Sequence, residues 1–341
     1  MKTLKIMMAV LFSSVIASGA HAGAISWTGS AEVTYNISGS ESTAAKSEGG
    51  KAMGITNDLS WNGTGELDNG YTWKISGDLD SGTVDDTYMT LTMGSLGTLG
   101  FYNDDGGMNK KHKSSQSAYS VGSDNGLTGS IVDAYDIGGL SNVRYTTPAG
   151  LLPNDISLAA SYYVGGTAAT VDPGDAGTAA ENIKDAFEIA MTMVPVEGAA
   201  FGAQYYHQDE EGNAQSGQKQ QSGTVYATYA FGPATIGGAL SRVAPTQETA
   251  SAVDVDWYEN IAYSAGFAVN DSLSISYEME TSAQEGTIAA NATYDVEVQS
   301  IQAAYTMGGM TLGLAMEDIE SAGYVQNADY KETTLSMAMD F

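Results

Sequence analysis

The chain has 341 residues, 13 basic and 41 acidic side chains, a formal net charge of −28 and no cysteine. This excess of negative charge argues against a nucleic-acid partner, and the lack of cysteine excludes a disulfide framework and a thiolate metal site. The composition, with 41 glycines, 20 tyrosines and apolar residues scattered along the chain, is unlike that of a water-soluble α/β enzyme.

Residues 1–22 have the form of a secretory signal peptide. Two lysines precede an apolar run from Ile6 to Ala17, and Ala20-His21-Ala22 has the small-x-small form of a cleavage site. The apolar run is too short to cross a bilayer as a helix, and no later segment approaches the roughly 20 apolar residues that such a span needs. We therefore predict an exported chain over residues 23–341 without a transmembrane helix.

Alternation of apolar and polar residues recurs along the whole exported chain. Successive side chains of a β-strand point to opposite faces, so this pattern predicts strands with one apolar and one polar face. Sixteen segments show it: 25–37, 53–61, 71–79, 89–93, 99–101, 143–145, 156–162, 187–193, 201–205, 225–231, 236–240, 261–267, 273–279, 301–307, 310–316 and 333–341. A change of parity near Ser300 is compatible with a β-bulge, and it leaves the strand count open by two.

The last of these segments indicates what surrounds the strands. Leu335, Met337, Met339 and Phe341 share one face, so an apolar strand ends the chain on an aromatic residue. Such a strand needs a partner strand and an apolar medium outside it, and a membrane β-barrel supplies both.

The connectors between the segments are sorted by length. The tight turns lie at residues 94–97, 197–198, 232–233, 270–271 and 308–309, and the long polar connectors at 38–51, 165–184, 209–222, 244–256, 281–293 and 320–330. Outer-membrane barrels have short periplasmic turns and long extracellular loops, and an even strand number lets the first and last strands pair. The other face of the strands is rich in Thr, Ser, Asn, Asp and Glu, which predicts a water-filled interior. The predicted fold class is therefore all-β, an antiparallel transmembrane barrel of about 16 strands.

Several short segments, in this order along the chain, resemble a known family. They are the strand after Ala22, the strand from Asn69-Gly70-Tyr71 to Gly77, the run 90–94 with its continuation to 99, the segment 142–148, and Phe341. Together they resemble the general bacterial (Gram-negative) porins of the alphaproteobacterial type. The resemblance implies a homotrimer of 16-stranded barrels in the outer membrane, each with a loop folded inward to narrow its pore.

The longest connector, residues 104–141, follows the fifth predicted strand, where that family has its constriction loop. The resemblance implies an acidic side of the constriction, for which Asp124, Asp133 and Asp136 are the candidates. The alternative is a long loop exposed on the surface of the barrel.

The family sets those acids against a basic cluster on the barrel wall. In this chain the candidates are Lys74 and Arg144, with Arg242 as a third, so the predicted cluster is sparse and departs from the family's grouped arginines. The acidic residues Glu32, Asp58 and Asp78 also occupy predicted lumen-facing positions. We therefore expect a weak transverse field, a negative lumen and a preference for cations.

The function that follows is passive diffusion of small hydrophilic solutes and ions through an outer-membrane porin, without catalysis. The expected partners also include outer-membrane lipid and lipopolysaccharide, which the basic run 110–113 could contact. Two alternatives share the barrel: a solute-specific porin with Tyr119 and Tyr135 as contacts, and a structural or adhesive barrel with a closed lumen.

An enzyme and a metal site are weaker interpretations. His207, beside Asp209, has no recognisable nucleophile motif near it. No cofactor is expected, although the acidic segments 103–105 and 209–213 carry enough oxygen ligands for Ca²⁺ without the spacing of an EF-hand loop.

Overall fold

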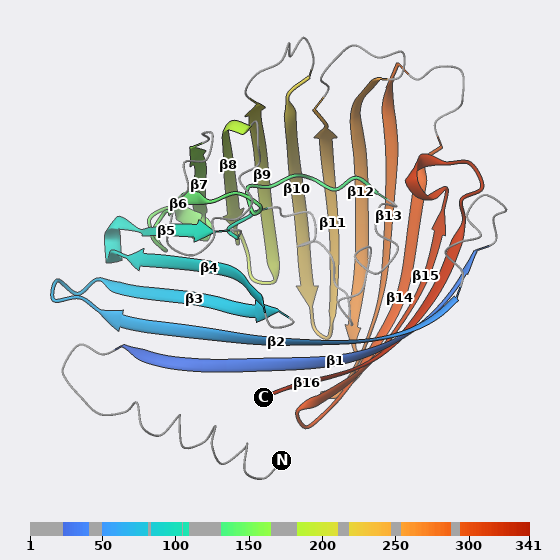
Figure 1. The fold of residues 1–341 in the computed structure, drawn as a ribbon, viewed down its shortest axis with the longest axis horizontal. Coiled ribbons are helices and arrows are strands. Elements are labelled where there is room, and N and C mark those ends of the chain that lie inside the picture. The colour runs from blue at the N-terminus through green and yellow to red at the C-terminus, as the bar shows by residue number, and fades with distance from the viewer. Residues whose placement is uncertain are drawn as a thin grey trace.

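The computed structural model describes residues 23–40, 50–80, 83–103, 105–108, 131–164, 183–210, 218–246, 254–287 and 294–341. Sixteen antiparallel strands form a closed barrel in which each strand pairs with its neighbours in sequence and β1 pairs with β16 (Figure 1). The predicted all-β barrel is confirmed. Within the described ranges, no helix combines the length and the apolar character that crossing a membrane requires.

Each predicted segment lies on a strand of its own and extends beyond that strand by one residue at most. The strands are β1 (Ala24–Ser40), β2 (Gly50–Glu66), β3 (Thr72–Asp80), β4 (Thr83–Thr92), β5 (Thr98–Asn103), β6 (Asn142–Thr146), β7 (Ser157–Val164), β8 (Ile183–Met193), β9 (Ala199–Glu210), β10 (Gln220–Phe231), β11 (Ala234–Ala244), β12 (Asp254–Ala268), β13 (Leu273–Thr287), β14 (Val296–Met307), β15 (Met310–Glu320) and β16 (Tyr330–Asp340). Several extend further toward the long connectors than predicted. Beyond the membrane the outward face need not be apolar, so the alternation fades there although the backbone pairing continues.

The barrel is apolar outside and polar inside. On β14, for example, Ile301 faces outward with 60% of its surface exposed, whereas its neighbours Ser300 and Gln302 face inward and are buried. The same alternation places Ile189 outside and Glu188 inside on β8. A protein surrounded by water has the reverse arrangement, so the outer face is built for contact with lipid.

The predicted tight turns are present. Two residues join β10 to β11 and two join β14 to β15, and Gly232 and Gly308 begin these turns with φ values of 58° and 65°. Glycine adopts this left-handed conformation without the steric cost that a Cβ atom brings. Figure 1 shows these turns at the bottom of the barrel, at the same end as the carboxyl end of β16.

The bulge that the parity change near Ser300 suggested is absent, because β14 pairs with both neighbours without a register shift. The parity changes because Val296 and Val298 are apolar residues at inward positions, where they pack with Ile319 and Tyr324. Register shifts occur instead where β3 meets β4, β8 meets β9 and β12 meets β13.

The seam of the barrel is closed at one end by Phe341. Its backbone exchanges hydrogen bonds of 2.8 and 2.9 Å with Gly29 of β1. The Phe341 ring lies over Gly29 so closely that a Cβ atom there would come within 2.5 Å of it. This contact requires glycine at position 29.

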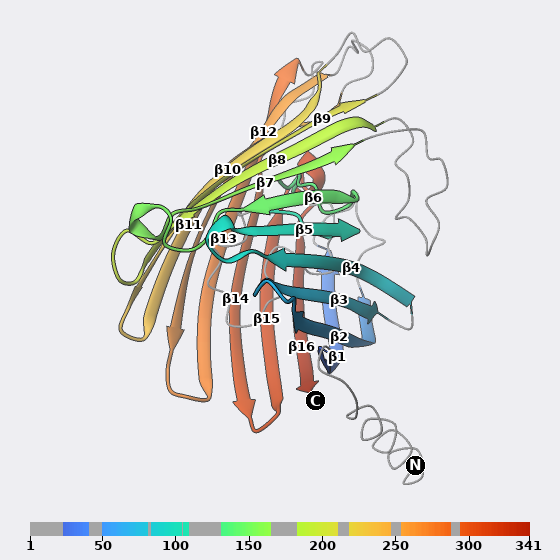
Figure 2. The same cartoon turned by 90° about the vertical axis from the view of Figure 1, so that its left-hand side faces the viewer.

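The wall is uneven in height. β5 has 6 residues and β6 has 5, whereas β12 and β13 have 15 each. Figure 2 shows the short strands β3 to β6 on one side and the long strands on the other. We call β3 to β6 the low wall and β12 to β16 the high wall.

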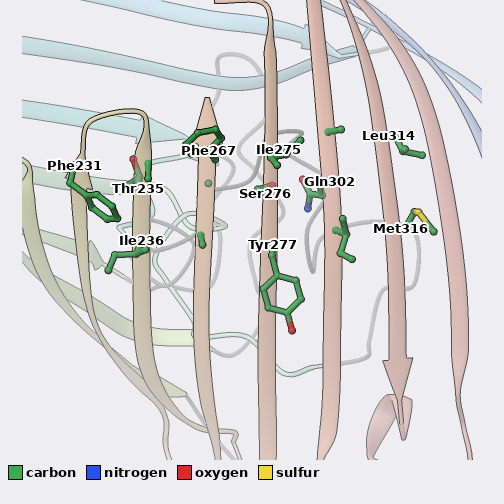
Figure 3. A pocket seen from close by; sticks show the side chains of 15 residues that line it. Phe231, Thr235, Ile236, Phe267, Ile275, Ser276, Tyr277, Gln302, Leu314 and Met316 are labelled. Atoms are coloured by element: carbon green, nitrogen blue, oxygen red, sulfur yellow. The ribbon is translucent and has the colours of Figure 1, made fainter. Parts of the chain in front are cut away.

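An apolar hollow of about 570 Å³ lies on the outer face of the barrel, across β10 to β15. Phe231, Ile236, Tyr277 and Met316 are among its lining residues (Figure 3). No charged residue lines it, and it contains none of the predicted site residues. We assign this hollow to the lipid-facing surface.

Candidate functional site

The connector between β5 and β6 enters the barrel, and Glu188 of β8 holds both of its described ends. The Glu188 carboxylate accepts hydrogen bonds from the backbone N–H of Met108 at 3.0 Å and of Ile137 at 3.2 Å. It also accepts one from the side-chain amide of Gln204 at 2.8 Å. Glu188 is 0% exposed. Because a buried carboxylate is costly unless its oxygens are occupied, these three donors make Glu188 the anchor of the connector.

The stretch that precedes Ile137, from Ile131 on, runs across the inward faces of further strands. The carbonyl of Tyr135 accepts hydrogen bonds from Gln204 of β9 at 2.9 Å and from Ser222 of β10 at 3.0 Å. The carbonyl of Val132 accepts one from Asn260 of β12 at 2.8 Å. Figure 1 shows this stretch as a green trace crossing the strands toward β13. The described part of the connector therefore lies inside the barrel.

Tyr324, in the connector between β15 and β16, fixes the far end of this stretch. Its hydroxyl accepts a hydrogen bond from the Val132 backbone N–H at 3.3 Å and lies 2.6 Å from the hydroxyl of Ser282. Its ring lies 5.0 Å from that of Tyr258. Tyr324 adopts a φ of 64°, an unfavourable conformation for a tyrosine, so the surrounding contacts hold it there.

The three predicted acidic residues of the connector have different outcomes. Asp124 lies outside the described residues. Asp133 and Asp136 are both partly buried, and Asp136 accepts a hydrogen bond from the Gly138 backbone N–H at 2.9 Å. A Cβ atom on Gly107 would come within 2.4 Å of the Asp136 carboxylate, so glycine lets the two ends of the connector pack together.

Tyr135, one of two aromatic candidates for solute contact, packs the connector against the wall. Its ring lies 6.4 Å from that of Tyr206, and both belong to the apolar cluster around Ile137 and Leu140. Burial raises the pKa of the Tyr135 hydroxyl above its ordinary value, so it stays neutral at physiological pH. The other candidate, Tyr119, lies outside the described residues.

Lys74 and Arg144 occupy inward positions, as predicted, and two tyrosines that the sequence analysis did not single out lie between them. Lys74 Nζ donates a hydrogen bond of 2.7 Å to the Tyr88 hydroxyl and lies 5.1 Å from the centre of its ring. Tyr88 stacks on Tyr102 with ring centres 5.5 Å apart. Arg144 Cζ lies 4.3 Å from the centre of the Tyr102 ring. These four residues, from β3, β4, β5 and β6, form a continuous row that we call the cation–tyrosine row.

Glycines make room for this row. Gly100 pairs directly with Arg144, and a Cβ atom on it would lie 2.5 Å from the Tyr102 ring. Gly106, with a φ of 95°, packs against Tyr102 and accepts a hydrogen bond on its carbonyl from Arg144 Nη2. Arg144 Nε donates to the Ser161 hydroxyl at 3.3 Å. The guanidinium group is therefore held on one face and on two edges.

The third basic candidate, Arg242, does not face the lumen. It has the same parity as the outward residue Leu240, and its side chain is 65% exposed. It forms an ion pair of 2.6 Å with Glu259 and lies 5.7 Å from the Trp257 ring. The prediction for Arg242 was wrong. Its two neighbours in sequence, Ser241 and Val243, are buried and face inward, and successive side chains of a strand point to opposite faces, so Arg242 faces outward.

Glu32, Asp58 and Asp78 are at inward positions, as predicted from the alternation of β1, β2 and β3. Asp58 is exposed, and Glu32 and Asp78 are partly buried. Asp78 accepts a hydrogen bond from the Asp86 backbone N–H at 2.9 Å. Their placement gives this side of the interior scattered negative charge.

A denser set of carboxylates lies on the high wall and was not predicted. The pairing register places Glu278 of β13 opposite Ser300, Ser300 opposite Glu317 of β15, and Glu317 opposite Glu332 of β16. The three glutamates, which we call the acidic row, face inward and are 4–8% exposed. The basic residue found in strands β12 to β16, Lys331, faces outward and pairs with Asp318 at 3.1 Å. Part of the signal was in the sequence, because Glu278 lies between Tyr277 and Met279 and Glu317 follows Met316, whereas Glu332 has the polar neighbours Lys331 and Thr333.

His207 lies near the end of β9, beside Phe187, with ring centres 5.3 Å apart and the ring planes tilted by 38°. Its Nε2 is 3.7 Å from Asp209, whose carboxylate also pairs with Lys219. No group of three acidic, histidine or cysteine side chains suited to a metal occurs in the described part of the chain, and residues 104 and 211–213 of the two calcium candidates lie outside it. Ca²⁺ binding in these segments stays a prediction.

Comparison with known proteins decides the family. The sequence matches the Gram-negative porin family over residues 7–296, which is most of the chain. The chain belongs to the Gram-negative porins. As a porin it is an outer-membrane channel and not an enzyme, and its location and general function are those predicted. A comparison with the curated proteins finds no match.

Solved porin structures share the fold at low sequence identity. OmpF of Salmonella typhi, in complex with daunomycin, superposes with a TM-score of 0.69 and 13% identity, covering 94% of this chain and 98% of that one. The anion-selective porin of Comamonas acidovorans gives 0.68 and 13%, with 94% and 100% covered. OmpT of Vibrio cholerae gives 0.64 and 12%, with 95% and 99% covered. The ionic preference of this porin must therefore be argued from its own residues.

Proposed function

We propose that this porin is a cation-selective diffusion channel for small hydrophilic solutes and ions, narrowed by the connector 104–141. The observation that carries the proposal is the path of residues 131–138 across the inward faces of β8 to β12, anchored on Glu188. A segment held against the inner wall reduces the free cross-section of the lumen.

The preference for cations is argued from the acidic row. Glu278, Glu317 and Glu332 are three carboxylates at one level of the wall, and Glu32, Asp58 and Asp78 extend the negative charge to β1, β2 and β3. Charge of one sign in a confined lumen with low-dielectric walls raises the local concentration of counter-ions. The anion-selective porin of Comamonas acidovorans shows that relatives of the same fold can have the opposite preference, so the sign must be measured.

The assembly and processing that the sequence predicted belong to the same proposal. Residues 1–22 are removed as a signal peptide, the barrel over 23–341 forms a homotrimer, and its outward apolar face contacts outer-membrane lipid and lipopolysaccharide. The exposed apolar side chains on the outer face of the barrel supply the surface for lipid and for neighbouring subunits.

The test is single-channel recording of the purified protein in a planar bilayer, with a reversal potential under a KCl gradient. Stable conductance steps with a cation-selective potential support the proposal. Anion selectivity would refute the role of the acidic row, and silence from correctly folded protein would favour the closed structural or adhesive barrel. A solute-specific porin predicts instead that one class of solute blocks the current or crosses faster than its size allows.

A further inference from the structure

The two inward-facing cations of the low wall are held by aromatic rings and not by carboxylates. Lys74 lies over Tyr88, and Arg144 lies over Tyr102. Within the described ranges, neither cation forms an ion pair with an acidic side chain, although the chain has a net charge of −28. Cation–π contacts position a charge without neutralising it, so both keep their capacity to bind an anion.

Both cations also keep hydrogen-bond donors. Of the three ammonium protons of Lys74, one is donated to Tyr88, and no other acceptor for Lys74 is found among the described residues. Arg144 uses Nε for Ser161 and Nη2 for Gly106, which leaves Nη1 for a ligand. The Tyr88 hydroxyl accepts from Lys74, so its own proton is available as well. Donors from a lysine and an arginine are those that bind carboxylate and phosphate oxygens best.

A cavity of about 460 Å³ lies beside Lys74 on the same wall. Its polar lining comprises Thr64, Glu66, Thr72, Lys74, Thr90 and Thr92. A volume of this size holds a small organic molecule, and threonine hydroxyls both donate and accept hydrogen bonds to the hydroxyl groups of a solute. The lining therefore combines one cation, Lys74, with one carboxylate, Glu66, and four threonine hydroxyls.

We propose that the cation–tyrosine row and the adjoining threonine-lined cavity form a binding station for small hydroxylated carboxylates, the chemical class of sugar acids. The carboxylate meets Lys74, the residue that the row shares with the cavity, and the hydroxyl groups of the solute meet Thr64, Thr72 and Thr90. The acidic row repels such a solute from the opposite side of the lumen, which directs its charged end toward the low wall. This inference rests on the proposed channel function, because the station would act on solutes that pass along the wall.

The test compares gluconate with sorbitol, two six-carbon polyols that differ in the carboxylate. Efflux of each radiolabelled solute is measured from proteoliposomes containing the wild type, Lys74→Gln, Arg144→Gln or the control Lys331→Gln, whose side chain faces outward. The ratio of gluconate to sorbitol efflux should fall about fivefold in Lys74→Gln, since losing one charge-assisted contact of roughly 1 kcal/mol changes an equilibrium by about that factor. Lys331→Gln should keep the wild-type ratio, and Lys74→Arg should retain most of it.

A second measurement does not depend on an open channel. Saturation-transfer NMR of gluconate with the folded protein in detergent should show binding to the wild type and to Lys331→Gln, and its loss in Lys74→Gln. If the protein binds gluconate but neither solute leaves the proteoliposomes, the proposed channel function is refuted and the proposed binding site is supported. If both solutes leave the proteoliposomes, and the gluconate-to-sorbitol efflux ratio and the NMR signal are the same in the wild type and in Lys74→Gln, the proposed binding site is refuted and the proposed channel function is supported.

Discussion

The low wall of β3 to β6 and the high wall of β12 to β16 place charged side chains of opposite sign in different ways, although Asp78 of β3 also faces the lumen. On the low wall, Lys74 and Arg144 lie on tyrosine faces. On the high wall, three glutamates share one level across neighbouring strands and are nearly buried. Strand register alone produces this separation, because a shift by one residue would turn each charged side chain to the lipid. The barrel wall itself thus sets the charge pattern of the lumen.

Removing the acidic row should have the largest effect on this contrast. In the variant Glu278→Gln/Glu317→Gln/Glu332→Gln we expect the permeability ratio of K⁺ to Cl⁻ to fall by roughly tenfold, because the wall no longer concentrates cations. The measurement is the reversal potential under a KCl gradient. Asp318→Asn, on the outward face of the same β15, is the matched control and should leave the potential unchanged. An unchanged ratio in the triple variant would show that the high wall does not set the selectivity.

Glu188 lies on β8, between the low wall and the high wall in strand order, and it holds the connector against the inner face of the barrel. Glu188→Ala leaves the N–H groups of Met108 and Ile137 and the amide of Gln204 without their acceptor, which should cost about 3 kcal/mol of unfolding free energy. Urea unfolding in detergent measures the loss, and single-channel conductance should rise and become noisier. Glu188→Gln keeps one acceptor oxygen and should show a smaller change in both. Wild-type conductance and stability in Glu188→Ala would mean that the other contacts suffice to hold the connector.

A substitution at Gly100 should disturb the packing of the Tyr102 ring in the low wall. A methyl group at Gly100→Ala would meet the Tyr102 ring at 2.5 Å, so the ring must move and Arg144 loses its support. We expect a loss of about 1–3 kcal/mol of unfolding free energy, the usual cost of overpacking. Gly238→Ala in β11 is the control, because the nearest heavy atom to its added methyl group is 3.6 Å away. Equal stability of the two variants would argue that the cation–tyrosine row is not tightly packed.

The acidic residues of the connector should matter least. Asp133→Asn and Asp136→Asn are expected to shift the reversal potential in the same direction as the triple variant but by less, because both side chains are partly buried and Asp136 already accepts a backbone hydrogen bond. The same KCl-gradient recording compares them directly. A larger shift than that of the triple variant would place the negative side of the pore on the connector and not on the high wall.

The sequence predicted the strands and turns because both leave local signals. Period-2 alternation marked each strand, and Gly232 and Gly308 marked turns whose backbone needs a positive φ. The bulge suggested near Ser300 was wrong because Val296 and Val298 are apolar but face inward, where a local apolar cluster accommodates them. Arg242 was assigned to the lumen, although it is two residues from the apolar Leu240 and should therefore share its outward face.

The site itself was predicted only in part. Lys74 and Arg144 were found because a charged residue among apolar neighbours signals an inward position. Tyr88 and Tyr102 were overlooked because tyrosine occurs on both faces of these strands, although its presence on a polar face was a usable signal. The path of the connector could not be predicted, because contacts such as that of Val132 with Tyr324 join residues far apart in sequence and leave no local pattern.

The pairing of Gly29 with Phe341 has a consequence for how the barrel forms. These two residues are far apart in sequence, so their hydrogen bonds close a very long loop and carry the entropic cost of bringing its ends together. Folding dominated by such non-local contacts is slow, and the unpaired edges of β1 and β16 remain open to other chains until it finishes. Sealing of the seam is therefore expected to be the last and slowest step, and the unsealed intermediate is the form that most needs protection from aggregation.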